Sequence, residues 1–333
     1  MEEKKVLIQV RELQRLIPLR AGKLGGERRY VHAVDGVSFD IYENETLALV
    51  GESGCGKSTL GKTILNLASP TGGKVLFKGT DIYSLSERDM RAMRQNMQIV
   101  FQDIGASLNS RHTVEQILMK PLSNYHPELS HEQMRQRAAE LLETAGLSPA
   151  EMYMLRYPHE FSGGQRQRIG IARAIALAPK FIVADEPVSA LDVSIRGQIL
   201  NLFNELKEKL NLSYLFITHD MSVVRSIADR VAVMYLGKIV ELADADDFFA
   251  NTAHPYSQAI LSATPIADPN LSRERTVVDL KGELPSPVNV PSGCRFRTRC
   301  RYACQECADR EPELTDIGGG HLCACHKLAS KVL

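Results

Sequence analysis

Short, unbroken apolar runs recur along the chain, separated by longer stretches in which apolar residues follow helical spacing. The runs occupy residues 47–50, 97–101, 181–184 and 214–217. An unbroken run of this length is typical of a parallel strand, because helices cover both faces of a parallel sheet and bury every side chain. The pattern therefore predicts an α/β fold around a parallel sheet.

Three other parts of the pattern differ from these runs. Residues 31–41 and 73–77 alternate apolar and polar side chains beside Gly and Asn turns, which predicts a small antiparallel sheet. Residues 113–177 are charged and amphipathic, as in 131–145, so we expect a helical subdomain there. After residue 265 the composition changes to proline, glycine and cysteine, which indicates a linker and a separate C-terminal segment.

Composition and charge narrow the function classes. The chain has 333 residues, enough for about two domains of ~150 residues. Its 40 basic and 40 acidic side chains balance, so no summed positive field attracts nucleic acid or anionic lipid. No apolar stretch approaches the ~20 residues of a membrane-spanning helix, and the N-terminus lacks the apolar core of a secretion signal. We expect a cytoplasmic protein that does not bind nucleic acid.

A glycine-rich loop carries the first chemical signal. Residues 51–58 read GESGCGKS, follow the apolar run 47–50 and lead into the helical stretch 59–66, which is the sequence context of a phosphate-binding loop. Its glycines let backbone N–H groups close around phosphate oxygens, and the helix start adds partial positive charge. We expect Lys57 to hold the β and γ phosphates and Ser58 to ligate Mg²⁺. The alternative for the motif alone is a glycine-rich turn with no ligand.

Two further motifs complete the pattern. Asp185 and Glu186 follow the apolar run 181–184, so they are predicted to lie at the carboxyl edge of the sheet, where Asp185 would reach Mg²⁺ and Glu186 would polarise an attacking water. Ser162 precedes the helical stretch 166–178 and is predicted to be its N-cap, which gives a second helix start able to face an anion.

In their order these motifs resemble the ATP-binding cassette family. The resemblance includes Gln102 after the run 97–101, the segment FSGGQ at 161–165, the segment SALD at 189–192 and His219. It implies a P-loop NTPase fold: a RecA-like core with an antiparallel β subdomain and a helical subdomain. It also implies an ATPase that works as a head-to-tail dimer, in which each nucleotide lies between the phosphate loop of one cassette and the 162–165 segment of the other.

The resemblance also implies the role of individual residues. Nucleotide contacts are implied for Gly51, Ser53, Gly54, Cys55, Gly56, Lys57, Ser58, Thr59, Ser162, Gly163, Gly164 and Gln165, although Cys55 occupies a free position of the motif and is expected to act mainly as a small filler. Mg²⁺ would be held by Ser58, Gln102 and Asp185. Glu186, His219 and Gln102 would be catalytic, and Asp192 would contact the opposite cassette.

Two positions depart from the family pattern. Ile17 stands where an aromatic residue usually stacks on adenine, so the adenine contact is expected to be apolar, with Tyr30 as the other candidate if the loop 20–29 folds back. The residues after Gln102 are Asp103, Ile104 and Gly105 instead of the common Asp-Pro, so the loop that meets the permease is expected to differ in stiffness.

Stretches outside the shared motifs make the resemblance more specific. Residues 156–168, 184–193, 254–265 and 282–287 look like those of the ATP-binding subunits of bacterial oligopeptide and dipeptide importers. This implies a peripheral, membrane-associated translocase subunit on the cytoplasmic face of the cell membrane. Its implied partners are two transmembrane permeases, a second, related ATP-binding subunit and an extracytoplasmic peptide-binding protein.

Some alternatives stay open at this point. The other class of function is a soluble cassette ATPase of translation or DNA repair, but such proteins carry paired cassettes or a long inserted coiled coil, and this chain has neither. The sequence does not select the cargo among dipeptides, longer peptides, nickel and other substrates. It also leaves open whether the dimer contains two copies of this chain or a related partner.

The cysteines indicate a metal site near the C-terminus. Cys55 stands alone, whereas the other cysteines lie between residues 294 and 325. The tail matches that of the importer family, which implies a [4Fe-4S] cluster held by Cys294, Cys300, Cys307 and Cys325. The alternative is zinc bound by a set drawn from Cys304, Cys307, Cys323, Cys325, His321 and His326. Reduced cysteines without metal, and a redox-sensing role in place of a structural one, are further alternatives.

These observations divide the chain into four predicted parts. Residues 1–102 form the antiparallel β and phosphate-loop part of the ATPase core, and residues 103–178 form the helical subdomain with the 161–165 segment. Residues 179–264 complete the core, and residues 265–333 form a cysteine-rich metal-binding extension.

Overall fold

The computed structural model describes residues 4–19, 28–264, 280 and 282–329, and its chain divides into two compact units. The first unit contains Tyr42–Glu45 and Ser84–Ile217 together with residues 4–5. The second contains Val6–Ile41, Thr46–Tyr83 and the described residues from 218 onward. The linker predicted from residue 265 lies largely outside the described residues.

Three parallel strands form the sheet of the first unit. They are β6 (Met97–Val100), β7 (Phe181–Asp185) and β8 (Ser213–Thr218), and β7 lies between the other two. Every residue of β7 and β8 is buried, as their unbroken apolar sequence predicts. The parallel arrangement of these runs is confirmed.

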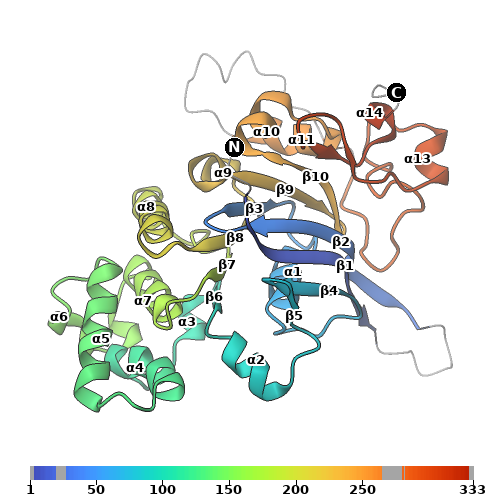
Figure 1. Cartoon of the computed structure of the whole chain (residues 1–333). Helices are drawn as coiled ribbons and strands as arrows, with labels where there is room; N and C mark the ends of the chain where they lie inside the picture. The colour runs from blue at the N-terminus through green and yellow to red at the C-terminus, as the bar shows by residue number, and fades with distance from the viewer. Residues whose placement is uncertain (1–3, 20–27, 265–279, 281, 330–333) are drawn as a thin grey trace. The chain divides into compact units, whose positions relative to one another are not determined.

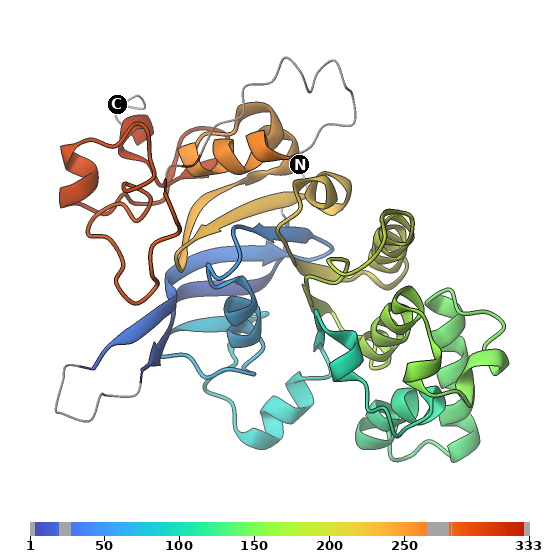
Figure 2. The ribbon, with the colours of Figure 1, turned by 180° about the vertical axis from the view of Figure 1, so that it is seen from behind.

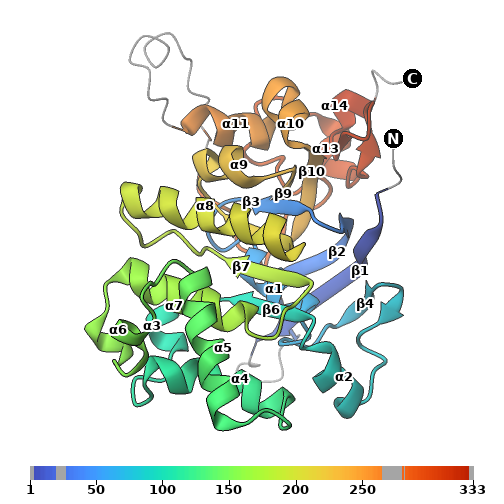
Figure 3. The same ribbon diagram turned by 60° about the vertical axis from the view of Figure 1, so that its left-hand side comes forward.

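Helices fill the rest of the first unit, and Figure 3 shows α3 to α7 gathered in one group. Their bounds are α2 (Glu87–Met93), α3 (Ile104–Ser107), α4 (Val114–Tyr125), α5 (His131–Thr144), α6 (Glu151–Met154), the 3₁₀ turn η1 (Pro158–Glu160), α7 (Gly163–Ile175) and α8 (Val193–Leu210). Helices α4, α5 and α7 each begin at a capping box, in which a Ser or Thr and a Gln satisfy each other's backbone N–H groups. The predicted helical subdomain is therefore present.

An antiparallel sheet opens the second unit. Its strands are β1 (Val6–Pro18), β2 (Tyr30–Tyr42), β4 (Gly72–Phe77) and β5 (Thr80–Asp81), in the order β2-β1-β4-β5 (Figure 1). Strand β1 pairs antiparallel with β4, with Ile8 opposite Phe77. The alternating pattern at 31–41 and 73–77 thus predicted the type of sheet, and β1 supplies the strand between those two segments.

A second group of strands leads to the phosphate loop. Strand β3 (Thr46–Val50) runs parallel to β9 (Arg230–Tyr235), and β10 (Lys238–Asp244) returns antiparallel. The short strands β12 (Leu322–Cys323) and β11 (Thr315–Asp316) extend this sheet beyond β10. The helices are α1 (Lys57–Ile64), α9 (Met221–Ile227), α10 (Ala245–Asn251), α11 (Pro255–Ala263), α13 (Gln305–Asp309) and α14 (His326–Ala329). Figure 2 shows the C-terminal residues, in red, beside β10 and α11.

One apolar cluster joins these elements inside the second unit. It includes Val50 of β3, Tyr235 of β9, Tyr256 of α11 and Phe296 of the C-terminal segment, all at most 2% exposed. The strand before the phosphate loop and the C-terminal segment therefore share a core. None of the helices in the described ranges combines the length and apolar character needed to traverse a lipid bilayer.

We expect Phe203→Ala to destabilise the first unit. The Phe203 side chain is 1% exposed, and its ring meets the rings of Tyr214 and Phe216 edge-on, both at 5.4 Å between centroids. Removing it leaves a cavity and is expected to reduce the free energy of unfolding by about 3–5 kcal/mol. The measurement is the unfolding midpoint in urea, with Leu155→Ala as control because Leu155 is 67% exposed. Equal midpoints for the two variants would contradict this packing.

Candidate functional site

The glycine-rich loop 51–58 joins β3 to α1 in the second unit. Gly56 has φ 111°, and a Cβ atom on it would lie 1.9 Å from the Ala33 carbonyl oxygen, so only glycine fits. Gly56 also occupies the N-cap position of α1 and has no side chain with which to cap it. The first N–H groups of α1 can therefore face an anion, as the motif predicts.

Lys57 is buried at the base of this loop. Its side chain donates hydrogen bonds from Nζ to the carbonyl oxygens of Gly51 at 2.7 Å and Glu52 at 3.0 Å. The Cys55 side chain is also buried, and this burial raises the pKa of its thiol. Any contact between position 55 and a nucleotide would therefore come from the backbone.

Gln102 and Glu186 meet at the carboxyl edge of the strands in the first unit. The Gln102 side-chain amide, just after β6, donates to Glu186 Oε2 at 3.0 Å. Asp185 ends β7 and is 3% exposed. Glu186 has φ 45°, and its backbone N–H donates to the Ile217 carbonyl at 3.0 Å. A left-handed backbone at a residue other than glycine is uncommon and marks a position fixed by its surroundings.

The 162–165 segment begins α7 in the same unit. Ser162 Oγ accepts a hydrogen bond from the Gln165 N–H at 3.3 Å, and Gln165 Oε1 accepts one from the Ser162 N–H at 3.0 Å. Ser162 is therefore the N-cap, which confirms that prediction. The helix begins at Gly163, upstream of the predicted start at residue 166, because the capping box outweighs the low helix propensity of two glycines. A Cβ on Gly164 would lie 2.5 Å from Ile195 Cγ2, so a larger residue here would displace the Ile195 side chain.

Two predicted residues outside these segments, His219 and Asp192, are exposed. His219 lies between β8 and α9, and Asp192 is the N-cap of α8. The structure thus groups the phosphate loop and His219 in the second unit, and Gln102, residues 162–165, Asp185, Glu186 and Asp192 in the first.

Five of the C-terminal cysteines surround one small pocket. It is lined by Cys294, Cys300, Cys304, Cys307 and Cys325, together with His326. The Sγ atoms of Cys304 and Cys307 lie 3.6 Å apart. Burial raises the pKa of the Cys294 thiol to about 11. All four sulfur ligands named for the cluster therefore lie around the same pocket, and so does Cys304.

Two of the candidate zinc ligands, His321 and Cys323, do not line this pocket. His321 is held elsewhere, 2.8 Å from a Glu241 oxygen and 2.6 Å from an Asp247 oxygen, and Cys323 is buried in β12 away from the pocket lining. Across the described ranges, no three His, Cys, Asp or Glu side chains are grouped closely enough to hold one metal ion. The described residues therefore contain no zinc site, and for the [4Fe-4S] cluster they show a shared pocket lining but no assembled metal site.

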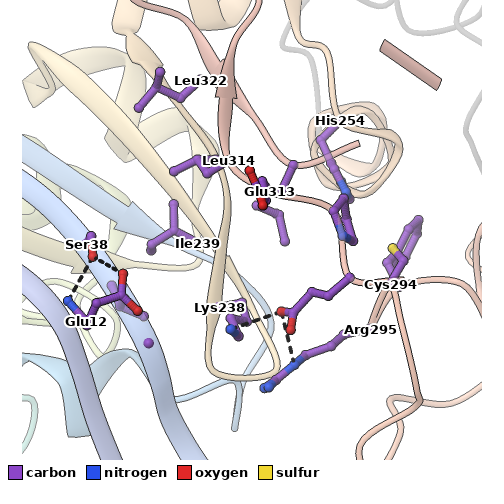
Figure 4. Close-up of a pocket in the computed structure, with 17 residues that line it drawn as sticks. Glu12, Ser38, Lys238, Ile239, His254, Cys294, Arg295, Glu313, Leu314 and Leu322 are labelled. Carbon is purple, nitrogen blue, oxygen red and sulfur yellow. Dashed lines mark hydrogen bonds and ion pairs between the residues drawn. The ribbon is translucent and has the colours of Figure 1, made fainter. Parts of the chain in front are cut away.

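A larger cavity of about 640 Å³ lies elsewhere in the second unit (Figure 4). Its walls come from β1, β2, β10 and the C-terminal segment, and include Glu12, Ser38, Ile239 and Leu314. Lys238 pairs with Glu311 at 3.0 Å across it. Of the residues predicted to form a site, Cys294 alone belongs to its lining, so the cavity is separate from the phosphate loop.

Comparison with known proteins identifies the family. A model of the ABC transporter family matches residues 34–189, and a model of the oligopeptide/dipeptide transporter C-terminal region matches residues 240–307. The chain is 51% identical over 321 residues to the oligopeptide transport ATP-binding protein AppF of Bacillus subtilis, covering 96% of this chain and 97% of that protein. It is 49% identical to OppF of Salmonella typhimurium over 315 residues, 94% of each chain.

The chain belongs to the ABC transporter family, among the ATP-binding subunits of oligopeptide and dipeptide importers.

Solved structures agree with this assignment. The ATP-binding cassette MJ0796, in a dimeric post-hydrolysis state bound to ADP and Pi, superposes with a TM-score of 0.63 at 30% identity, covering 72% of this chain and 98% of that one. The predicted cassette fold, the importer family and the ATPase activity of this importer subunit are thus confirmed. The alternative of a translation or repair ATPase is not favoured.

The importer subunit also contains site residues that the sequence did not indicate. Arg299 forms a double ion pair with Glu52 of the phosphate loop, at 2.7 and 3.1 Å, and Tyr256 binds the backbone of Glu52. Glu52 occupies a free position of the motif, and Arg299 lies 247 residues away, in a segment whose only recognisable motif is its cysteines. No local signal connects the two.

The His321 contacts predict a pH-dependent stability of the C-terminal segment. Hydrogen bonding to Glu241 raises the pKa of His321 above its ordinary value of about 6.5. A raised pKa means that the folded state favours the charged form, so the stabilisation is complete below about pH 6.5 and is lost as pH rises through the folded-state pKa. We expect His321→Gln to lower the unfolding temperature more at about pH 6 than at about pH 9.

The control is His131→Gln, because His131 is exposed. The measurement stays at or above about pH 6, since burial lowers the pKa of His254 to about 4 and makes the protein less stable as the solution becomes more acidic. An equal loss of stability for His321→Gln at both pH values would show that the histidine acts only as an uncharged packing group.

Proposed function

We propose that this importer subunit hydrolyses MgATP at two composite sites, formed head-to-tail with a second, related ATP-binding subunit, and thereby drives peptide uptake through two permeases. The observation that carries the proposal is the glycine-rich loop with Lys57 buried at its base and the uncapped start of α1 beside it. A buried cation next to a helix N-terminus that no side chain caps is matched by a polyphosphate.

The first step of the proposal is nucleotide binding. Residues 51–59 would surround the phosphates with backbone N–H groups, and Lys57 Nζ would exchange its bonds to the Gly51 and Glu52 carbonyls for bonds to the β and γ phosphates. Ile17, at the end of β1 and 36% exposed, would supply an apolar contact to adenine. Both contacts come from the second unit.

The second step is hydrolysis. Glu186 would accept a hydrogen bond from the attacking water and orient it towards the γ phosphorus. The Gln102 amide, which donates to Glu186, holds this carboxylate in place and can point its oxygen towards Mg²⁺. Ser58, Gln102 and Asp185 fit Mg²⁺ because the ion prefers oxygen ligands, and it would neutralise charge on the phosphates. His219 would hydrogen-bond to the γ phosphate.

The third step is closure of the dimer. The N-terminus of α7, capped by Ser162, would face the γ phosphate bound to the opposite subunit, and Asp192 would contact that subunit. Because one nucleotide would be held by both chains, ATP would favour the closed dimer and hydrolysis would release it. This cycle is the proposed source of mechanical work.

An exposed apolar group in the first unit supports a permease contact. Met152, Leu155 and Tyr157, in and after α6, are 63%, 67% and 41% exposed. A contiguous exposed apolar patch is a common feature of protein interaction sites. We propose that this segment and residues 103–105 face a permease at the cytoplasmic side of the membrane, and that cargo is selected by the permeases and an extracytoplasmic peptide-binding protein.

Replacing Glu186 by Gln tests the assignment of the catalytic group. The amide keeps the shape of the side chain and its contact with Gln102 but is a much weaker base, so we expect ATP hydrolysis to fall about 10²–10⁴-fold. ATP binding should be retained. Phosphate release and binding of a fluorescent ATP analogue with Mg²⁺ measure the two properties. A native rate of hydrolysis would remove Glu186 from this role.

Lys57→Ala is the matched comparison for the same assays. It removes the cation at the base of the loop, so nucleotide binding itself should weaken. Unchanged affinity in this variant would argue against the phosphate loop as the nucleotide site.

We also propose a [4Fe-4S] cluster held by Cys294, Cys300, Cys307 and Cys325. The observation in favour is that these four thiols line one pocket. The fit is chemically reasonable because a cluster takes four thiolates, one for each iron, and does not require them to meet at one ion. When bound, the cluster would cross-link a segment that has little apolar core of its own and so stabilise its fold.

An absorbance spectrum of anaerobically purified protein tests the cluster. We expect a broad visible band and about four iron atoms per chain. Cys300→Ser should lose both, and Cys323→Ser should keep both because Cys323 does not line the pocket. Stoichiometric zinc, or a colourless and metal-free protein, would contradict the proposal.

A further inference from the structure

One residue of the phosphate loop is held from three sides. The Glu52 backbone N–H donates to Tyr256 Oη at 2.8 Å, and the Glu52 carboxylate accepts two hydrogen bonds from Arg299 at 2.7 and 3.1 Å. The Glu52 carbonyl accepts from Lys57 Nζ at 3.0 Å. The backbone and side chain of the second loop residue are thus both fixed, and the lysine that would bind phosphate is part of the same group.

Two of these partners come from the C-terminal region. Tyr256 lies at the start of α11, and Arg299 follows the segment that carries Phe296; both fall within residues 240–307, which match the oligopeptide/dipeptide C-terminal model. The rings of Tyr256 and Phe296 pack at 5.4 Å between centroids, and each packs against Tyr235, at 4.6 and 5.3 Å. Tyr256 is fully buried and Arg299 is 8% exposed, so both partners of Glu52 are enclosed by packed side chains.

Charge gives a second reason for the contact. A carboxylate inside a phosphate-binding loop repels the phosphates unless it is neutralised. Arg299 pairs with Glu52 through two parallel hydrogen bonds, the strongest geometry for this pair, and an arginine side chain does not lose its proton in proteins. The guanidinium therefore stays charged, and it neutralises the Glu52 carboxylate before a nucleotide binds.

We infer that the C-terminal region positions the phosphate loop for nucleotide, with Arg299 and Tyr256 as positioning residues that act through Glu52. This inference rests on nucleotide binding by the loop. It assigns to the C-terminal region a role in the affinity of the ATP site in addition to any metal that it holds. If the loop already has its binding conformation, less conformational entropy is lost when nucleotide binds. Loss of this positioning should therefore weaken nucleotide affinity and leave the rate of the chemical step unchanged.

The test measures binding of a fluorescent ATP analogue with Mg²⁺ to the purified full-length chain. Arg299→Ala leaves Glu52 unpaired and loosens the loop, so we expect affinity to fall about tenfold or more, as loss of a charged hydrogen-bonded pair predicts. KM for ATP should rise by the same factor, while kcat at saturating ATP should stay within about twofold of the native value. Arg299→Lys should be intermediate, because it keeps the charge but loses the double hydrogen bond.

Arg297→Ala is the matched control. Arg297 lies two residues away in the same segment and hydrogen-bonds to Ser292, not to the loop.

Tyr256→Phe removes only the hydroxyl group and keeps the ring, so it should weaken affinity in the same direction but less. Its control is Tyr214→Phe, which removes a buried hydroxyl bonded to the Phe203 carbonyl and should leave affinity unchanged. Thermal unfolding of each variant shows whether the fold is intact, and if Arg299→Ala does not fold, Arg299→Lys and Tyr256→Phe decide.

A second readout does not depend on activity. Binding and positioning are reciprocal, so nucleotide should slow hydrogen exchange in residues 294–300 of the native chain and should do so less in Arg299→Lys. Native affinity in Arg299→Ala, or an equal loss in Arg297→Ala, overturns the inference. If Lys57→Ala abolishes binding while the Arg299 variants do not change it, the inference alone fails; if Lys57→Ala also binds normally, the proposed site itself fails.

Discussion

The buried charge of Lys57 is the constraint on which the rest of the second unit depends. A cation that is only 5% exposed has lost most of its contact with water, and the carbonyls of Gly51 and Glu52, with the Cys55 sulfur at 3.9 Å, take the place of that water. The loop can hold the lysine there because β3 is fully buried and ends at the loop, and because Gly56 passes close to the Ala33 carbonyl where no side chain fits. A polyphosphate would offer Lys57 charged oxygens in place of these neutral carbonyls, and charged acceptors form the stronger hydrogen bonds.

Local patterns in the sequence predicted a large part of this structure. Strand β3, which precedes the phosphate loop, and strand β7, which ends at Asp185, have the apolar sequences typical of a sheet covered by helices on both faces. Ser162 was recognisable as a cap because a capping box needs only residues three positions apart. Even there, the exact first turn of α7 could not be predicted, since Gly163 and Gly164 have low helix propensity and enter the helix because the capping box of Ser162 and Gln165 encloses them.

Contacts between distant residues could not be predicted in the same way. The bonds of Glu52 to Tyr256 and Arg299 join positions 204 and 247 residues apart, and neither pair follows a repeat, a spacing or a charge pattern. The cysteines show the same limit. The resemblance to the importer family implied four ligands, but the pocket is lined by five cysteines, because the first turn of α13 places Cys304 beside Cys307. Which thiol is spare depends on that turn, not on the interval between residues.

The acidic residue in the phosphate loop links these observations. Electrostatics alone would disfavour Glu52 beside a triphosphate, and the motif does not require an acid at that position. The acid becomes useful once a buried arginine from the C-terminal region pairs with it, because the pair then attaches that region to the loop without leaving an uncompensated charge on either side. Neither residue is explained by its own element: Arg299 without Glu52 would be a buried, unpaired cation, and Glu52 without Arg299 would repel the ligand. The two positions therefore act as one unit, and replacing either residue leaves the charge of the other without its partner.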